Sequence, residues 1–136
     1  MRKYIAMILA TIMVMGFTGC NNKNTVQSSV VNEIGYTQIS MDEAVSMMEE
    51  ETDYIILDVR TPEEFAEKHI PNAINIPNET IGDDAIPELP REDQVILVYC
   101  RSGNRSKQAS EKLSALGYTT VYEFGGINDW MGEVVK

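Results

Sequence analysis

A single cysteine lies in a short polar segment whose residue types favour a reactive thiolate. Cys100 ends an apolar run and is followed by the loop 101–106, beyond which apolar residues recur at helical spacing. Amides at a helix start lack intrahelical partners and carry the positive end of the helix dipole, so they favour an anion. Gly103 can adopt a positive φ, while Arg101 and Arg105 add permanent positive charge. We expect these surroundings to lower the pKa of the thiol and to make Cys100 a nucleophile.

An inert cysteine buried in a strand is the alternative interpretation of Cys100. The glycine and the two arginines that follow it favour the reactive thiol instead. His69 is the only histidine in the chain. It lies in a turn before Ile70 and Pro71, where a structural hydrogen bond is favoured over a catalytic role. The thiol is therefore expected to be activated by its loop and not by a histidine base.

The loop resembles the active-site loop of the rhodanese-like sulfurtransferases, and its matching residues are Cys100-Arg101-Ser102-Gly103-Asn104-Arg105. Other segments agree with this family in order and spacing: Leu57-Asp58-Val59-Arg60, Glu63-Glu64-Phe65, His69 to Pro77, and Gly125-Gly126-Ile127 with Trp130. One departure is Asn72, where the family usually has glycine, although asparagine also tolerates a left-handed turn. The resemblance spans about residues 36–132. It implies that Cys100 is catalytic and carries a persulfide, and that the substrate-binding residues around the transferred sulfur are Arg101, Ser102, Gly103, Asn104 and Arg105.

The length of the loop after the cysteine distinguishes sulfur transfer from phosphatase or arsenate reductase chemistry on related folds. Phosphatases related to this fold place an arginine six positions after the cysteine, which gives a wider loop for phosphate or arsenate. Here Arg105 lies five positions after Cys100, and the sixth position is Ser106. The shorter loop is expected to enclose one sulfur atom. This favours sulfur transfer over phosphatase or arsenate reductase activity.

The sequence therefore predicts a two-step sulfurtransferase of the thiosulfate sulfurtransferase type. Cys100 is expected to take sulfane sulfur from thiosulfate, a polysulfide or a persulfide, and a thiophilic acceptor then removes it. The alternative from another class is a sulfur-carrier or redox partner module without efficient turnover. Neither function needs a metal or an organic cofactor, so we expect none.

Asp58 and Arg60 are predicted to support the site, because they lie at the carboxyl end of a predicted central strand. Ligands bind at this end of the strands in open α/β sheets, so both side chains are candidates to line the pocket. A buried ion pair or loop-bracing role, with Glu64 or Glu67 as a further partner, is the favoured interpretation.

Strand and helix patterns alternate along the chain. Capping boxes begin predicted helices at Ser40 and Thr61, and Gly117 stands where a glycine would end the helix after the loop. The strand patterns cover residues 36–39, 54–59, 73–76, 95–99 and 119–124. This alternation predicts a mostly parallel, five-stranded α/β sheet with helices on both faces, as the rhodanese-like resemblance also implies, in one domain over residues 35–136.

Residues 1–19 have the pattern of a signal peptide and are not expected to belong to the fold. Arg2 and Lys3 precede an apolar stretch, 5–17, that is short for a membrane span. A lipoprotein signal, an ordinary secretory signal and an uncleaved anchor all place the domain outside the cytoplasm.

The end of this signal, Phe17-Thr18-Gly19-Cys20, resembles the bacterial lipobox, which implies lipidation of Cys20. Residues 20–34 are expected to form a flexible tether between the cell membrane and the domain. Lipidation would leave Cys100 without a disulfide partner, while a Cys20–Cys100 disulfide is the less favoured alternative.

The net charge excludes nucleic acid as an expected partner. The chain has 21 acidic and 11 basic residues and a net charge of −10, and loss of residues 1–19 would make it more negative. A negative surface also repels anionic donors, so Arg101 and Arg105 must dominate the local field. The expected partners are small sulfur-containing anions or persulfides and a thiol protein acceptor, and the domain is expected to be monomeric.

Overall fold

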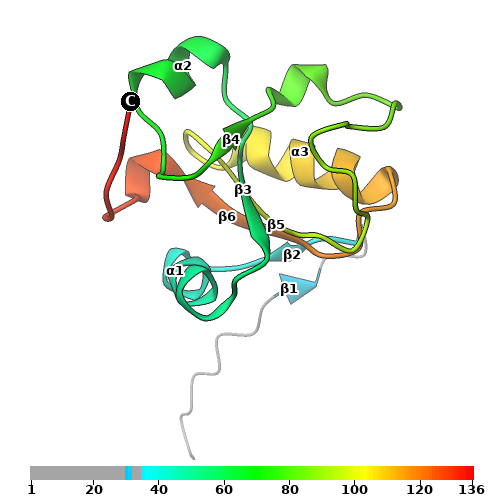
Figure 1. Ribbon diagram of the computed structural model, residues 1–136, viewed down its shortest axis with the longest axis horizontal. Helices are drawn as coiled ribbons and strands as arrows, with labels where there is room; N and C mark the ends of the chain where they lie inside the picture. The colour runs from blue at the N-terminus through cyan, green and yellow to red at the C-terminus, as the bar shows by residue number, and fades with distance from the viewer. Residues whose placement is uncertain (1–29, 32–34) are drawn as a thin grey trace, which may run out of the picture.

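A parallel sheet forms the centre of the molecule (Figure 1), in a computed structural model that describes residues 30–31 and 35–136. Its five parallel strands are β2 (Thr37–Gln38), β3 (Tyr54–Asp58), β4 (Ile74–Asn75), β5 (Val95–Cys100) and β6 (Val121–Gly126). A sixth strand, β1 (Val30–Val31), pairs antiparallel with β2, and the full order is β1-β2-β6-β5-β3-β4. The predicted mostly parallel α/β sheet is confirmed.

The helices begin where the capping residues predict. The elements are α1 (Met41–Glu50), α2 (Pro62–Glu67), α3 (Asn104–Ala115) and the short 3-10 helices η1 (Asn78–Thr80) and η2 (Ile127–Asp129). Ser40 and Glu43 form a complete capping box at α1, and Thr61 and Glu64 form one at α2. Both boxes satisfy backbone amides that a helix start leaves unpaired. The box at α2 also fixes the position of Glu64.

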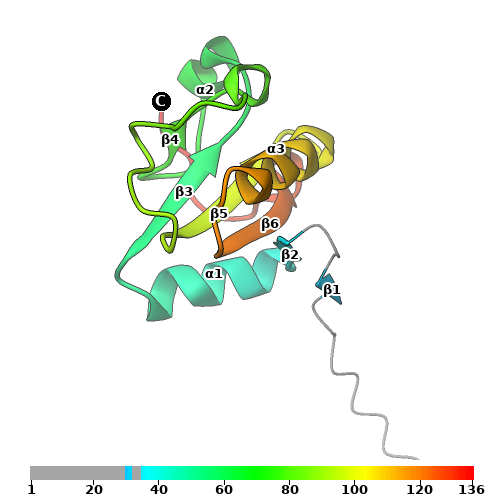
Figure 2. The ribbon, with the colours of Figure 1, turned by 90° about the vertical axis from the view of Figure 1, so that its right-hand side faces the viewer.

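Helices cover both faces of the sheet. Figure 2 shows α1 on one side and α3 on the other. On β5, Ile96 and Val98 belong to the core cluster that includes Leu113 of α3, whereas Leu97 and Tyr99 belong to the cluster on the α1 side. This alternation follows from the two-residue period of a strand. Cys100 continues it on the α3 face, directly under the start of that helix.

Gly117 and Asn72 have a positive φ, as their positions in the sequence predict. Gly117, with φ of 103°, follows the end of α3, and its amide donates a hydrogen bond to the carbonyl of Ser114. Asn72 has φ of 67° and so adopts the turn conformation that asparagine tolerates. The replacement of glycine by asparagine at this position is therefore compatible with the local backbone.

The amino-terminal predictions lie mainly outside the described residues. This applies to the signal peptide, to Cys20 and to most of the tether range 20–34. Within that range, Val30 and Val31 pair with β2. Among the residues that the structure describes, no helix combines the length and the apolar character needed to cross a bilayer.

Candidate active site

Cys100 lies at the carboxyl end of β5 and is almost completely buried, with 1% of its surface exposed. The Gly103 amide donates a hydrogen bond of 3.0 Å to its sulfur atom. Gly103 has φ of 109° and caps α3, which begins at Asn104. The loop is therefore shorter than predicted, because the left-handed glycine already starts the helix. Asn104 and Arg105 belong to the first helical turn, and only residues 101–103 form the loop.

The surroundings of Cys100 favour the thiolate, as predicted. Burial by itself raises the pKa of the thiol, since it disfavours the charged form. A hydrogen bond with the Ser106 hydroxyl and hydrogen bonds from the backbone amides of Ser106, Gly103 and Ser102 outweigh burial and leave the pKa below its ordinary value. The amides at the start of α3 therefore act on sulfur as the helix-start argument anticipates.

Ser106 and Glu123 form a buried polar pair behind the nucleophile. Ser106 Oγ lies 3.4 Å from Cys100 Sγ and 2.6 Å from Glu123 Oε1. The Gly125 amide donates a second hydrogen bond, of 2.9 Å, to the same carboxylate oxygen. Pairing between β5 and β6 shifts register here, so that Val98 pairs with Glu123 but Cys100 with Gly126. Such a bulge redirects side chains beside a site.

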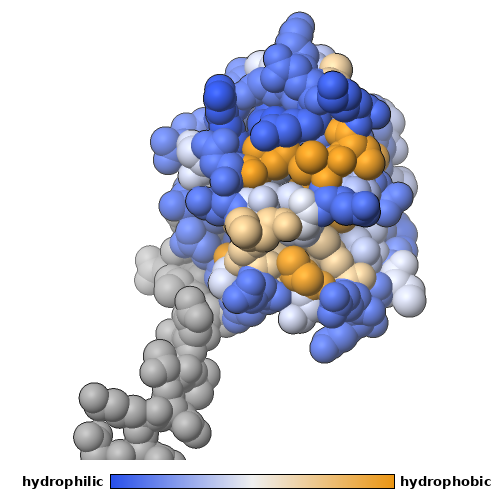
Figure 3. All heavy atoms as spheres, turned by 90° about the vertical axis from the view of Figure 1, so that its left-hand side faces the viewer, coloured by the Kyte–Doolittle hydropathy of each residue, from blue (hydrophilic) through white to orange (hydrophobic). Residues whose placement is uncertain are grey.

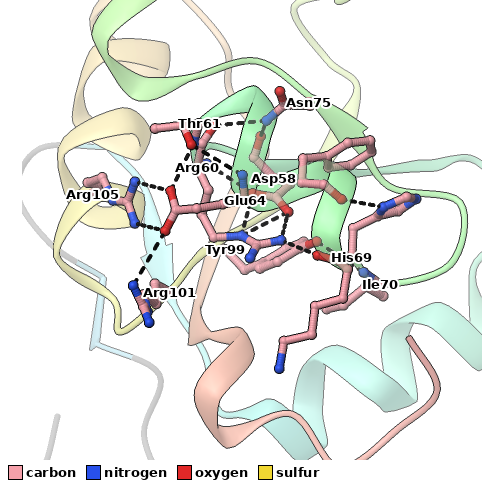
Figure 4. Close-up of polar contacts among 12 residues, drawn as sticks. Asp58, Arg60, Thr61, Glu64, His69, Ile70, Asn75, Tyr99, Arg101 and Arg105 are labelled. Atoms are coloured by element: carbon pink, nitrogen blue, oxygen red, sulfur yellow. Dashed lines mark hydrogen bonds and ion pairs between the residues drawn. The ribbon is translucent and has the colours of Figure 1, made fainter. Parts of the chain in front are cut away.

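The two arginines share one acidic partner, Glu64 (Figure 4). Arg105 makes two hydrogen bonds to the Glu64 carboxylate, of 2.7 and 3.0 Å. Arg101 Nη1 lies 3.9 Å from Glu64 Oε1, and its side chain is 67% exposed. The hydrogen bond from Arg105 is the main cause that lowers the Glu64 pKa to about 2. Glu64 therefore partly neutralises the charge of the two arginines beside Cys100.

Asp58 and Arg60 form a buried ion pair, with Arg60 Nη2 2.6 Å from Asp58 Oδ2. Arg60 Nη2 also donates a hydrogen bond of 2.7 Å to the Lys68 carbonyl, and its guanidinium lies 5.8 Å from the centre of the Tyr99 ring. Figure 4 shows this pair beside Glu64, whose carboxylate is turned toward Arg101 and Arg105. The geometry thus supports a structural role for Asp58 and Arg60, in which the ion pair braces the loop after β3. Glu64, proposed as a partner of this pair, instead binds Arg105.

The end of β6 supports the loop from beneath. A Cβ atom on Gly126 would overlap the backbone of Arg101 and Ser102, so only glycine fits without a shift. The Asn128 amide of η2 donates a hydrogen bond of 3.2 Å to the Arg101 carbonyl. Trp130, directly after η2, packs against Phe124 with ring centroids 6.4 Å apart. The segment Gly125-Gly126-Ile127 thereby holds the loop in place.

His69 has a structural role, as predicted. Its Nδ1 atom is 2.9 Å from the Phe65 carbonyl oxygen, and its ring stacks on Phe65 with centroids 3.8 Å apart. Its backbone also forms an isolated β-bridge with Val135. These contacts tie α2 to the C-terminal segment.

The C-terminal segment carries the large apolar side chains that are exposed in the described part of the chain: Met131, Val134 and Val135. Figure 3, viewed from the side on which this segment lies, shows apolar side chains gathered between hydrophilic ones. The same segment continues from η2, which contacts the Cys100 loop. An apolar surface thus adjoins the elements that support the site.

Sequence analysis missed the site roles of Glu64, Ser106 and Glu123. Glu123 had a detectable signal, because a charged residue in the apolar strand 121–126 must find a polar partner when it is buried. Ser106 was noted only as the sixth position after Cys100. Glu64 was expected to be a partner of Asp58 and Arg60, and its contact with Arg105 instead depends on how α2 packs near α3.

Comparisons with known proteins agree with this geometry. The family model described as the rhodanese-like domain matches residues 40–133. The thiosulfate sulfurtransferase PspE of Escherichia coli is 40% identical over 73 residues, which cover 54% of this chain and 70% of that protein. A sulfurtransferase of Allochromatium vinosum is 36% identical over 102 residues, which cover 74% of this chain and 89% of that protein. A solved structure described as a rhodanese with anions from E. coli has a TM-score of 0.56 at 37% identity, covering 61% of this chain and 98% of the other.

Proposed function

Because the chain belongs to the rhodanese-like family, we propose that it is a sulfurtransferase in which Cys100 takes sulfane sulfur from a donor and passes it to a thiophilic acceptor. The observation that carries this proposal is the sulfur atom of Cys100 at the start of α3, 3.0 Å from the Gly103 amide. Sulfurtransferase names among the relatives support the reaction class. Thiosulfate, a polysulfide and a persulfide are the proposed donors.

In the first step, the Cys100 thiolate attacks the sulfane sulfur of the donor. A new S–S bond forms on Cys100, the S–S bond within the donor breaks, and the electron pair of that bond leaves with sulfite or a thiolate. The negative charge then lies on the terminal sulfur of the persulfide. The Gly103 amide and the Ser106 hydroxyl are placed to stabilise negative charge on sulfur throughout.

In the second step, an acceptor such as cyanide or a thiolate attacks the terminal sulfur. The S–S bond to Cys100 breaks, and Cys100 leaves as the thiolate that began the cycle. A low thiol pKa assists this step as well, because a more stable thiolate is a better leaving group. Arg101 and Arg105 attract the anionic donor from outside the loop.

The test is intact-mass measurement of the domain after treatment with thiosulfate or polysulfide. We expect a gain of one sulfur atom that cyanide removes and that Cys100→Ser does not show. Steady-state turnover with excess thiosulfate and cyanide separates an enzyme from a carrier, since a carrier loads once without efficient turnover. Failure to load from either donor, or Cys100-dependent hydrolysis of an aryl phosphate in its place, would rule out the proposed reaction.

We further infer that this chemistry takes place outside the cytoplasm, on a lipid-anchored protein. The support is the signal pattern in residues 1–19 and its lipobox-like end at Cys20. The test is fatty-acid labelling of the full chain expressed in bacteria, with Cys20→Ser as the control. We expect label and membrane association in the wild type only. An exported but unlabelled wild type would overturn lipidation, and a cytoplasmic one would overturn export.

A further inference from the structure

Glu123 is a buried carboxyl group on β6 to which the proposed sulfur transfer gives no role. It is 1% exposed, and none of the ion pairs found within the described ranges involves it. Its Oε1 atom receives hydrogen bonds from the Ser106 hydroxyl and the Gly125 amide. A negative charge without a cationic partner is costly in such a place, and a proton on the carboxyl group removes that cost.

Ser106 connects this carboxyl group to the nucleophile. Its Oγ atom is 2.6 Å from Glu123 Oε1 and 3.4 Å from Cys100 Sγ, and all three side chains are buried. The carbonyl oxygens of Gly103 and Gly125 lie 2.9 and 3.3 Å from the same hydroxyl, and Glu123 Oε1 is the nearest of its acceptors. A hydroxyl group has one proton but also accepts hydrogen bonds, so it can relay in either direction. With a thiol, Cys100 donates to Ser106 and Ser106 donates to the carboxylate. With a thiolate, the carboxylic acid donates to Ser106 and Ser106 donates to sulfur.

We propose that Cys100 and Glu123 share one proton through Ser106, and that Glu123 holds this proton when Cys100 is a thiolate. The S–H bond breaks and its electron pair stays on sulfur. Ser106 gains the thiol proton and gives its own proton to Glu123. No electron leaves the site and no co-reactant is required. The buried site thus carries one negative charge, located on either sulfur or oxygen.

The relay also suits the sulfur-transfer cycle, and this part of the inference rests on the proposed function. The thiolate and the persulfide each carry one negative charge on sulfur. A protonated Glu123 can therefore remain protonated through both half-reactions while Ser106 donates toward sulfur. Glu123 is a positioning residue, since it acts on the nucleophile through Ser106 and does not touch the transferred atom.

Few other charged groups face the relay. Arg105 contributes a favourable charge near Cys100, and Glu64 binds Arg105 with a pKa of about 2. Both therefore keep their charge in mild acid. The remaining charged residues of α3 point to solvent or to Asn78: Lys107, Glu111 and Lys112. On β5, Tyr99 belongs to the core on the opposite face of the sheet. Changes in thiolate content between mild acid and neutral pH therefore report on the Cys100–Glu123 pair.

Infrared difference spectroscopy of the reduced domain tests where the proton lies. We expect the C=O stretch of a protonated carboxyl group under conditions in which ultraviolet absorbance shows the Cys100 thiolate. This band should be absent in Glu123→Gln and should vanish when iodoacetamide alkylates Cys100, because the neutral thioether no longer keeps Glu123 protonated. Thiolate absorbance without this band, or a band that survives in Glu123→Gln, would overturn the inference.

The pH dependence of alkylation provides a second test. The wild type should show a plateau in rate over the range in which the pair holds one proton, whereas Glu123→Gln and Ser106→Ala should each show one simple titration step. Ser106→Ala should also react about tenfold more slowly in mild acid, through loss of a hydrogen bond to sulfur.

Ser110→Ala is the matched control, because Ser110 is buried one turn further along α3 and its hydroxyl has no partner among the described residues. It should retain the wild-type profile. Identical profiles for Ser106→Ala, Glu123→Gln and the wild type would contradict the relay. Both measurements use no sulfur donor, so a failure of the proposed sulfur transfer would leave their outcome unchanged.

Discussion

At the scale of single residues, a backbone amide and a hydroxyl group are the hydrogen-bonding groups close to the sulfur of Cys100, while the arginines lie further out. The Gly103 amide and the Ser106 hydroxyl lie 3.0 and 3.4 Å from Sγ. Arg105 makes its hydrogen bonds to Glu64, and Arg101 extends into solvent. The thiolate therefore depends on the start of α3, whereas the arginines are suited to attract an anionic donor.

Replacement of either arginine should weaken binding of the sulfur donor, but only replacement of Arg105 should also lower the stability of the fold. We expect Arg101→Ala to raise the KM for thiosulfate by about three- to tenfold with little change in stability, because its side chain is exposed. Arg105→Ala should raise KM and also cost about 1 kcal/mol, because it leaves Glu64 without its partner. Steady-state kinetics and urea denaturation measure the two effects.

Lys107→Ala is the control for the arginine variants, since it removes one exposed positive charge from α3. Raised ionic strength should help binding of thiosulfate to the wild type less than either arginine substitution impairs it. An Arg101→Ala variant with full activity toward thiosulfate would show that this arginine does not attract the donor.

Glu64 should contribute a pH-dependent part of the stability. Its folded-state pKa of about 2 lies below its ordinary value of 4.5, mainly because of Arg105. The contribution is therefore complete above pH 4.5 and is lost as the pH falls toward 2. We expect Glu64→Gln to cost about 1 kcal/mol near neutral pH, discounted for the solvent that reaches this pair. Denaturation at several pH values should show the difference from wild type shrinking in acid.

Glu63→Gln provides the comparison, because Glu63 is an exposed neighbour with the same charge. It should follow the wild type at every pH. Glu64→Gln should also bind thiosulfate more tightly, since Arg105 and Arg101 are no longer partly neutralised. An unchanged KM together with an unchanged stability would mean that the Glu64–Arg105 pair has no energetic role.

At the scale of elements, the Cys100 loop is held between α3 and the end of β6. Gly103 starts the helix above the loop, and Gly126 lies against the Arg101 backbone below it. The register shift between β5 and β6 occurs at the same place and brings Gly126 opposite Cys100. The loop therefore takes its shape from two neighbouring elements and not from its own three residues alone.

Gly126→Ala should distort this loop. The φ of Gly126 is −139°, which any residue adopts, so the expected cost comes from overlap with the Arg101 carbonyl and not from backbone strain. We expect a loss of about 1–3 kcal/mol in stability and a reduced rate of sulfur loading on Cys100. Gly82→Ala is the control, because its Cβ would meet no atom within 4 Å. Equal loading rates for the two variants would exclude this packing contact as a determinant of the site.

At the scale of the whole molecule, the Asp58–Arg60 pair links distant segments around the sheet. Arg60 binds Asp58 at the end of β3 and the carbonyl of Lys68 after α2, and it lies near the Tyr99 ring of β5. The Tyr99 hydroxyl in turn accepts a hydrogen bond from the Ile70 amide. These contacts stabilise the edge of the sheet from which α2 presents Glu64 to the arginines.

Asp58→Asn should destabilise the entire domain. Loss of one partner leaves the Arg60 guanidinium buried without its counter-charge, which typically costs about 3–5 kcal/mol. Asp53→Asn, which removes an exposed partner of Arg91, should leave stability nearly unchanged. Urea denaturation monitored by Trp130 fluorescence measures both. A stability of Asp58→Asn equal to that of Asp53→Asn would contradict the bracing role.

Much of the fold was predictable because its signals are local. The capping boxes at Ser40 and Thr61 involve residues three positions apart, and the strand pattern before Cys100 depends on adjacent residues. The position of the thiol at the end of β5 follows from the same local pattern. The sequence did not predict that α3 begins at Asn104, since this depends on the left-handed backbone of Gly103.

The sequence by itself therefore determined the order of the elements and the position of the candidate nucleophile, Cys100, at the end of β5. Only the tertiary structure decided which charges meet: Glu64 with Arg105, 41 positions apart, and Glu123 with Ser106, 17 positions apart. The physical reason is that hydrogen bonds and ion pairs act over a few ångströms, whereas strand register and helix packing decide which distant residues come that close.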